Sequence, residues 1–131
     1  MVRSYPDERP SETVGVTERI RTGHGIMYIT INFDPQGERR PFEVLGRLGK
    51  AGACDTAQLE AISRLVSLAL RCGIDPEEIV DTLRGISCCS AWDEGTLVRS
   101  GPDAIALALE RHMTPEQNST SLIVEQPGFP S

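Results

Sequence analysis

The hydrophobic pattern changes its period once along the chain, and this change constrains the fold more than any other feature. Apolar side chains alternate with other residues over 26–33 and again over 42–48. A period of two residues is typical of a β-strand with one buried face, and Pro35 and Gly37 between the two segments suit a turn. After Cys54 the apolar positions recur every three or four residues, which is the period of an amphipathic helix. The sequence therefore predicts an antiparallel hairpin followed by helices.

Three helices are predicted, over residues 55–72, 76–84 and 102–113. Gly73 suits the end of the first, and Asp75 followed by Pro76 suits the beginning of the second. Ser100 and Asp103 have the spacing of a capping pair at the start of the third. We predict an α+β fold in which a small antiparallel sheet, with the hairpin 26–33/42–48, packs against about three α-helices.

The two ends of the chain differ from this central part in composition. Residues 1–16 are rich in proline, serine and charged residues with little apolar periodicity, so we expect a flexible leader. Residues 114–131 have a similar composition but include the mainly apolar segment SLIV. We therefore expect a flexible or partner-docking tail. The domain itself is expected over residues 17–113.

Charge and hydropathy exclude some classes of function. The most apolar stretch, AISRLVSLAL, is interrupted by polar residues, so no membrane span is expected. The charged start lacks the apolar segment of a signal peptide, which favours a cytoplasmic location. A net charge of −6 argues against nucleic-acid binding, which needs clustered lysine and arginine.

A glycine-rich segment, GRLGKAGAC, joins the predicted hairpin to the first predicted helix. Gly49, Lys50 and Gly52 there resemble an anion or nucleotide site, where glycines allow close approach and helix N–H groups face the ligand. The spacing lacks the pattern of a phosphate-binding P-loop. A sharp turn without a ligand is the favoured interpretation.

The four cysteines raise the question of a metal site. Cys54 lies at a predicted helix start, which favours the thiolate form. Cys88 and Cys89 are adjacent, with Cα atoms about 3.8 Å apart, too close for an ordinary disulfide. They remain either metal ligands, together with Cys54 and His24, or two buried thiols, and spacing alone favours the buried thiols. Neither His24 nor His112 has the sequence context of a Cys–His catalytic pair, so no catalytic residue is predicted.

Three stretches together carry a resemblance to a known family. They are TERIRTGHGIMYITINFDPQG, FEVLGRLGKAGACDTAQLEAISRLVSLALRCGIDPEEIVDTLRGISC and SGPDAIALAL. In this order they resemble the TSCPD domain, a module found at the C-terminus of adenosylcobalamin-dependent (class II) ribonucleotide reductases and in short stand-alone proteins. The resemblance covers roughly residues 17–113.

The resemblance also implies a set of ligands for a metal, most simply zinc. RSGPD, residues 99–103, stands where the family has its Thr-Ser-Cys-Pro-Asp motif, so Gly101 replaces the family's cysteine. His24 stands where the family commonly has a cysteine, and Cys54 and Cys88 match cysteine positions. Cys89 would then replace the missing ligand. A site formed by His24, Cys54, Cys88 and Cys89 and a copy without metal remain equal alternatives.

The function that the resemblance implies is a non-catalytic accessory or regulatory subunit that docks on a larger redox enzyme. Nothing in this chain provides a cobalamin site. Two alternatives stay open: an accessory subunit of another oxidoreductase, such as a molybdenum-dependent formate dehydrogenase, and a nucleotide- or nucleic-acid-binding module. Self-association into a homo-oligomer is a further hypothesis.

Overall fold

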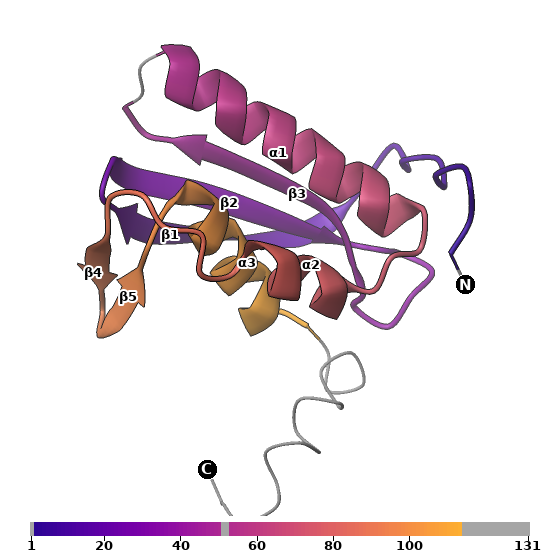
Figure 1. Ribbon diagram of the computed structural model, residues 1–131. Helices are drawn as coiled ribbons and strands as arrows, with labels where there is room; N and C mark the ends of the chain where they lie inside the picture. The colour runs from indigo at the N-terminus through magenta and orange to yellow at the C-terminus, as the bar shows by residue number, and fades with distance from the viewer. Residues whose placement is uncertain (1, 51–52, 114–131) are drawn as a thin grey trace, which may run out of the picture.

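The computed structural model describes residues 2–50 and 53–113, which form one sheet, a small second hairpin and three helices (Figure 1). The elements follow in the order β1 (Val14–Thr22), β2 (Gly25–Phe33), β3 (Pro41–Leu48), α1 (Ala53–Arg71), α2 (Pro76–Leu83), β4 (Ala91–Asp93), β5 (Thr96–Val98) and α3 (Gly101–Arg111). This arrangement confirms the predicted α+β class. No helix among the described residues is long and apolar enough to cross a membrane.

The main sheet is an antiparallel meander in the order β1-β2-β3, and its last two strands are the predicted hairpin. Met27 and Ile29 of β2 are fully buried, and alternate residues of β1 and β3 point to the same side. α3 supplies the opposite wall of the core, with seven consecutive buried residues from Asp103 to Leu109. The core therefore lies between one face of the sheet and α3.

Helix α1 runs along the outer edge of the sheet beside β3 (Figure 1). The Ser67 hydroxyl accepts a hydrogen bond from the Val44 N–H and donates one to the Val44 carbonyl, both at 3.0 Å. The Ser63 hydroxyl accepts from the Gly46 N–H at 2.9 Å. These two serines interrupt the apolar pattern of α1 because they satisfy the backbone groups that an edge strand leaves unpaired.

Strand β1 was not predicted from the sequence. Its inward positions include Glu18, whose charge disrupts the alternation with Val16 and Ile20. The Glu18 carboxylate accepts hydrogen bonds from Arg111 at 2.8 Å and from the His112 ring at 2.6 Å, at the end of α3. A polar residue at an inward position of this strand is therefore explained by partners on α3.

The N-terminal segment contacts the domain at several points. The Arg3 N–H donates to the Cys72 carbonyl and the Asp7 N–H to the Arg71 carbonyl, each at 2.8 Å. Arg9 donates to the buried Glu43 carboxylate of β3 at 2.6 Å. Strand β1 begins at Val14 and so includes the last residues of the expected leader. The expected tail, residues 114–131, lies outside the described residues.

Candidate metal centre

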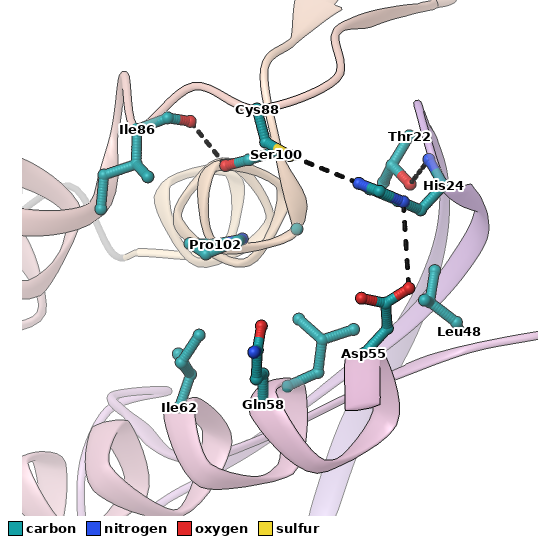
Figure 2. A pocket seen from close by; sticks show the side chains of 12 residues that line it. Thr22, His24, Leu48, Asp55, Gln58, Ile62, Ile86, Cys88, Ser100 and Pro102 are labelled. Carbon is teal, nitrogen blue, oxygen red and sulfur yellow. Dashed lines mark hydrogen bonds and ion pairs between the residues drawn. The ribbon is translucent and has the colours of Figure 1, made fainter. Parts of the chain in front are cut away.

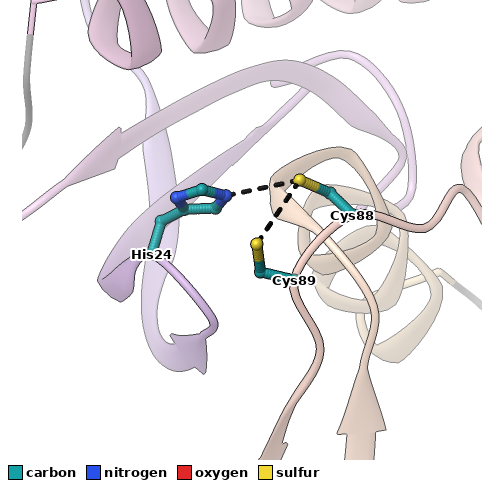
Figure 3. A group of neighbouring side chains, drawn as sticks. All are labelled: His24, Cys88 and Cys89. Atoms are coloured by element: carbon teal, nitrogen blue, oxygen red, sulfur yellow. Dashed lines mark hydrogen bonds between the residues drawn. The ribbon is translucent and has the colours of Figure 1, made fainter.

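Three of the four sequence-predicted metal ligands come together at one end of the sheet. His24, Cys88 and Cys89 place their ligand atoms within 4.8 Å of one another, and all three residues are exposed (Figure 3). His24 lies in the turn between β1 and β2, whereas the two cysteines lie 64 and 65 positions further along the chain. The interpretation of Cys88 and Cys89 as buried thiols is wrong, because both are exposed.

The turn that carries His24 is shaped by the residues around it. The Thr22 hydroxyl donates to the Gly25 carbonyl at 2.7 Å and accepts from the His24 N–H at 3.1 Å. Gly25 has a positive φ of 114°, a conformation that side chains rarely adopt. Gly23 has another role, because a Cβ there would lie 2.1 Å from the Cys89 carbonyl oxygen. The glycines of TGHG thus allow the turn to form and to approach the cysteines closely.

A bend at Cys88 and Cys89 directs both thiols toward His24 (Figure 3). In an extended strand, neighbouring side chains point to opposite faces, so the bend is what allows both sulfurs to serve one ion. The Cys88 N–H donates to the Arg99 carbonyl at 2.9 Å. This bond fixes the segment before β4 to the residue that follows β5.

Buried Asp103 holds both ends of the segment that carries the cysteines. Its carboxylate accepts hydrogen bonds from the Arg84 guanidinium, the Gly85 N–H and the Arg99 N–H, each at 2.9 Å. The Ser100 hydroxyl, which caps α3, also donates to the Ile86 carbonyl. The segment SGPD therefore starts α3 and also holds residues 84–86 and 99 in place through hydrogen bonds.

Two of the three distances between the ligand atoms agree with those around one tetrahedral zinc ion. Zn–S bonds of about 2.3 Å put two sulfurs about 3.8 Å apart, and a Zn–N bond of about 2.0 Å puts nitrogen and sulfur about 3.5 Å apart. The Cys88 and Cys89 sulfurs are 3.8 Å apart, and His24 Nε2 lies 3.4 Å from the Cys88 sulfur. The chemistry and spacing of these three side chains are therefore those of a group that could hold a metal ion.

Hydrogen bonds within the group shift the pKa values of the two thiols in opposite directions. The hydrogen bond with His24 lowers the pKa of Cys88, and the contact with Cys89 lowers it further. The same bond with Cys88 raises the pKa of His24. The hydrogen bond and the charge of the Cys88 thiolate raise the pKa of Cys89. In the metal-free protein Cys88 is therefore the thiol that ionises first.

We expect the metal-free protein to be alkylated by iodoacetamide at Cys88 at a lower pH than at Cys89. Only the thiolate attacks, so the thiol with the lowered pKa reacts first as the pH rises. Peptide mass spectrometry after timed alkylation at a series of pH values measures both rates. In His24→Ala the reaction at Cys88 should move to higher pH; an unchanged profile would contradict the role of His24.

The comparison with protein families identifies the domain that carries this site. A family model described as the TSCPD domain matches residues 3–113. This chain belongs to the TSCPD domain family. No curated protein and no solved structure matches it. The matched range begins 14 positions before the resemblance seen in the sequence, and it includes Arg3, Asp7 and Arg9, which contact the end of α1 and strand β3 as described above.

Cys54, the fourth sequence-predicted ligand, is not brought into the group. It is exposed in the first turn of α1, and among the described residues it does not belong to the set of ligand atoms that all lie within 4.8 Å of one another. The carboxylate of the neighbouring Asp55 lies 3.9 Å from His24 Nδ1, an ion-pair contact that is longer than a hydrogen bond (Figure 2). A carboxylate on the second ring nitrogen is the usual partner of a metal-bound histidine. Sequence spacing gave no signal for this pairing.

A pocket of about 260 Å³ adjoins the group (Figure 2). His24, Cys88 and Asp55 form its wall on one side. The start of α3 forms another side, at Ser100–Pro102, and α1 closes the pocket with its first turns. Apolar side chains predominate in the rest of the lining, which consists mainly of Leu48, Leu59, Ile62 and Ile86. No pattern in the sequence predicted this pocket.

The predicted anion-binding segment is described only in part. Gly49 and Lys50 are exposed after β3, and Gly52 lies outside the described residues. The Gly49 N–H donates to the Ile26 carbonyl at 2.8 Å, so this N–H is already used within the sheet. An anion or nucleotide site at these residues stays a prediction.

Proposed function

We propose that this TSCPD domain is a non-catalytic accessory subunit with a metal site formed by His24, Cys88 and Cys89. The observation that supports the metal site is that the Cys88–Cys89 sulfur distance and the His24–Cys88 nitrogen–sulfur distance match those around one zinc ion, while all three ligand atoms lie within 4.8 Å of one another. Two thiolates and an imidazole are ligands that zinc favours. The ion would join the β1–β2 turn to the segment before β4 and so stabilise this end of the domain.

Metal analysis tests this site. We expect about one zinc per chain in protein purified without chelators, and almost none in His24→Ala or in Cys88→Ser. Cys54→Ser is the matched control. Because Cys54 lies outside the group, the variant protein should keep its zinc. Zinc-free wild-type protein would contradict the proposal. Loss of zinc in Cys54→Ser would instead make Cys54 a ligand after a local rearrangement.

The proposed partner is a larger redox enzyme, most simply a class II ribonucleotide reductase. The family membership supports this choice, because the TSCPD domain is a module that the resemblance associates with those reductases. The chain has no predicted catalytic residue of its own. A cytoplasmic location and self-association remain parts of this proposal.

Affinity purification from the native host, followed by mass spectrometry, tests the partner. We expect recovery of a ribonucleotide reductase chain in amounts comparable to the tagged protein, and none with an unrelated tagged protein. Recovery of a molybdenum-dependent formate dehydrogenase would favour the second candidate. If neither enzyme is recovered, the accessory role on these two enzymes is contradicted.

A further inference from the structure

The geometry points to an open metal site: we propose that an ion on His24, Cys88 and Cys89 keeps its fourth position for a small thiol whose apolar body fills the adjoining pocket. This inference depends on the proposed metal site and adds a ligand class to it. Structural zinc sites have four protein ligands, whereas sites that bind a small molecule have three and leave one position open. The described residues supply three.

The pocket and the metal group share two side chains. His24 and Cys88 both line the pocket, while Cys89 is not among the described residues that line it. Asp55 also lines it, and its carboxylate faces the ring nitrogen of His24 that is turned away from Cys88. A donor atom that enters the pocket therefore reaches the side of the group formed by the imidazole and the Cys88 sulfur.

The lining selects the body of the ligand. It contains no lysine or arginine, so a phosphate or carboxylate group would find no cationic partner. Asp55 adds a negative charge near the metal group. An apolar cavity of about 150 Å³ can hold benzene, so a pocket of about 260 Å³ has room for a ring with a short substituent. These features favour an uncharged apolar body.

The metal selects the head group. An ion that already binds two thiolates is a soft acceptor, and sulfur is its preferred further ligand. Zn²⁺ or Co²⁺ with two thiolates and a neutral imidazole has no net charge, so one more anion can join. On binding, the S–H bond of the ligand would break, a metal–sulfur bond would form, and the proton would pass to solvent.

Cobalt-loaded full-length protein provides the test, with phenylmethanethiol as the probe and phenylmethanol as the matched control without sulfur. The thiolate-to-cobalt charge-transfer absorbance reports the number of bound sulfurs. We expect a saturable rise of about one half with the thiol, because the count goes from two sulfurs to three. Phenylmethanol should leave this band unchanged, and cobalt content after desalting should stay constant.

Substitutions in α1 test whether the ligand lies in the pocket. Ile62→Trp fills the pocket and should weaken thiol binding by about tenfold or more. Leu65→Trp changes an exposed residue of the same helix outside the pocket and should bind like the wild type. Gln58→Trp, at an exposed lining position, replaces Ile62→Trp if circular dichroism shows that the latter does not fold.

The outcomes separate the two proposals. Failure to bind cobalt overturns the metal site and this inference together. Cobalt binding without a spectral response to the thiol, or loss of cobalt to it, overturns only the inference. Before any thiol is added, the cobalt absorbance could already correspond to three sulfurs in the wild type and to two in Cys54→Ser. This result would show that the fourth position is already filled. Equal thiol affinity in the pocket variants and in Leu65→Trp would place the ligand on the solvent side. That result would overturn the proposal that the ligand occupies the pocket.

Discussion

Replacing Asp103 by asparagine is expected to lower the free energy of unfolding by about 3 kcal/mol. The Asp103 carboxylate is fully buried and accepts hydrogen bonds from Arg84, Gly85 and Arg99. An asparagine keeps the shape but presents an amide N–H₂ group to one set of these donors. One or two N–H groups then lose their acceptor, and the Arg84 guanidinium loses its buried charged partner at 2.9 Å and keeps only the ion pair with Glu110 at 3.8 Å. Urea denaturation followed by circular dichroism measures the change.

Asp81→Asn is the matched control for this measurement. Asp81 is exposed on α2, so the same change of charge there should alter the free energy of unfolding by less than about 0.5 kcal/mol. Arg84→Ala should cost less than Asp103→Asn, because Arg84 is partly exposed and both backbone donors to Asp103 remain. Equal stability of the Asp103 and Asp81 variants would show that the buried carboxylate does not anchor the cysteine segment.

The second large effect is expected at a residue that binds no metal. Gly23→Ala should weaken zinc affinity by about 10- to 100-fold, the range found when supports of metal ligands are removed. An added Cβ would lie 2.1 Å from the Cys89 carbonyl oxygen and 2.5 Å from its carbon. Backbone atoms cannot rotate away as a side chain can, so the turn and the bend must separate. Competition with a chromophoric zinc chelator measures the affinity.

Gly37→Ala provides the control for this substitution. Gly37 lies in the turn between β2 and β3, and the nearest atoms to an added Cβ are side-chain carbons at 3.4 Å, an ordinary contact. The zinc affinity of this variant should equal that of the wild type. If Gly23→Ala also binds zinc like the wild type, the close approach of the turn to Cys89 is not needed for the site.

The local residue pattern was sufficient to predict the elements whose burial and ends depend on residues close in sequence. The alternation in 26–33 and 42–48 predicted β2 and β3, and the capping residues Asp75 and Ser100 predicted the starts of α2 and α3. Both cap side chains accept a backbone N–H of the first helical turn, as expected. Hydrophobic period and caps act within a few residues, so they can be read without knowing the fold.

Elements that depend on distant partners were missed. Strand β1 has Glu18 at an inward position, which is accommodated only because Arg111 and His112 lie against it. The hairpin of β4 and β5 has three residues in each strand, too few for a periodic pattern. Ser63 and Ser67 looked like interruptions of α1, but they satisfy the edge of β3.

Residue patterns alone were enough to predict the α+β class, the order of the main hairpin and helices, the family, and the residue types able to bind a metal. Which of those residue types meet in space depends on the folded chain. It brought His24 to Cys88 and Cys89, left Cys54 outside and placed Asp55 against the imidazole. Ligand geometry depends on a turn, a bend and an anchor that are distant in sequence, and their contacts form only when the core between the sheet and α3 is packed.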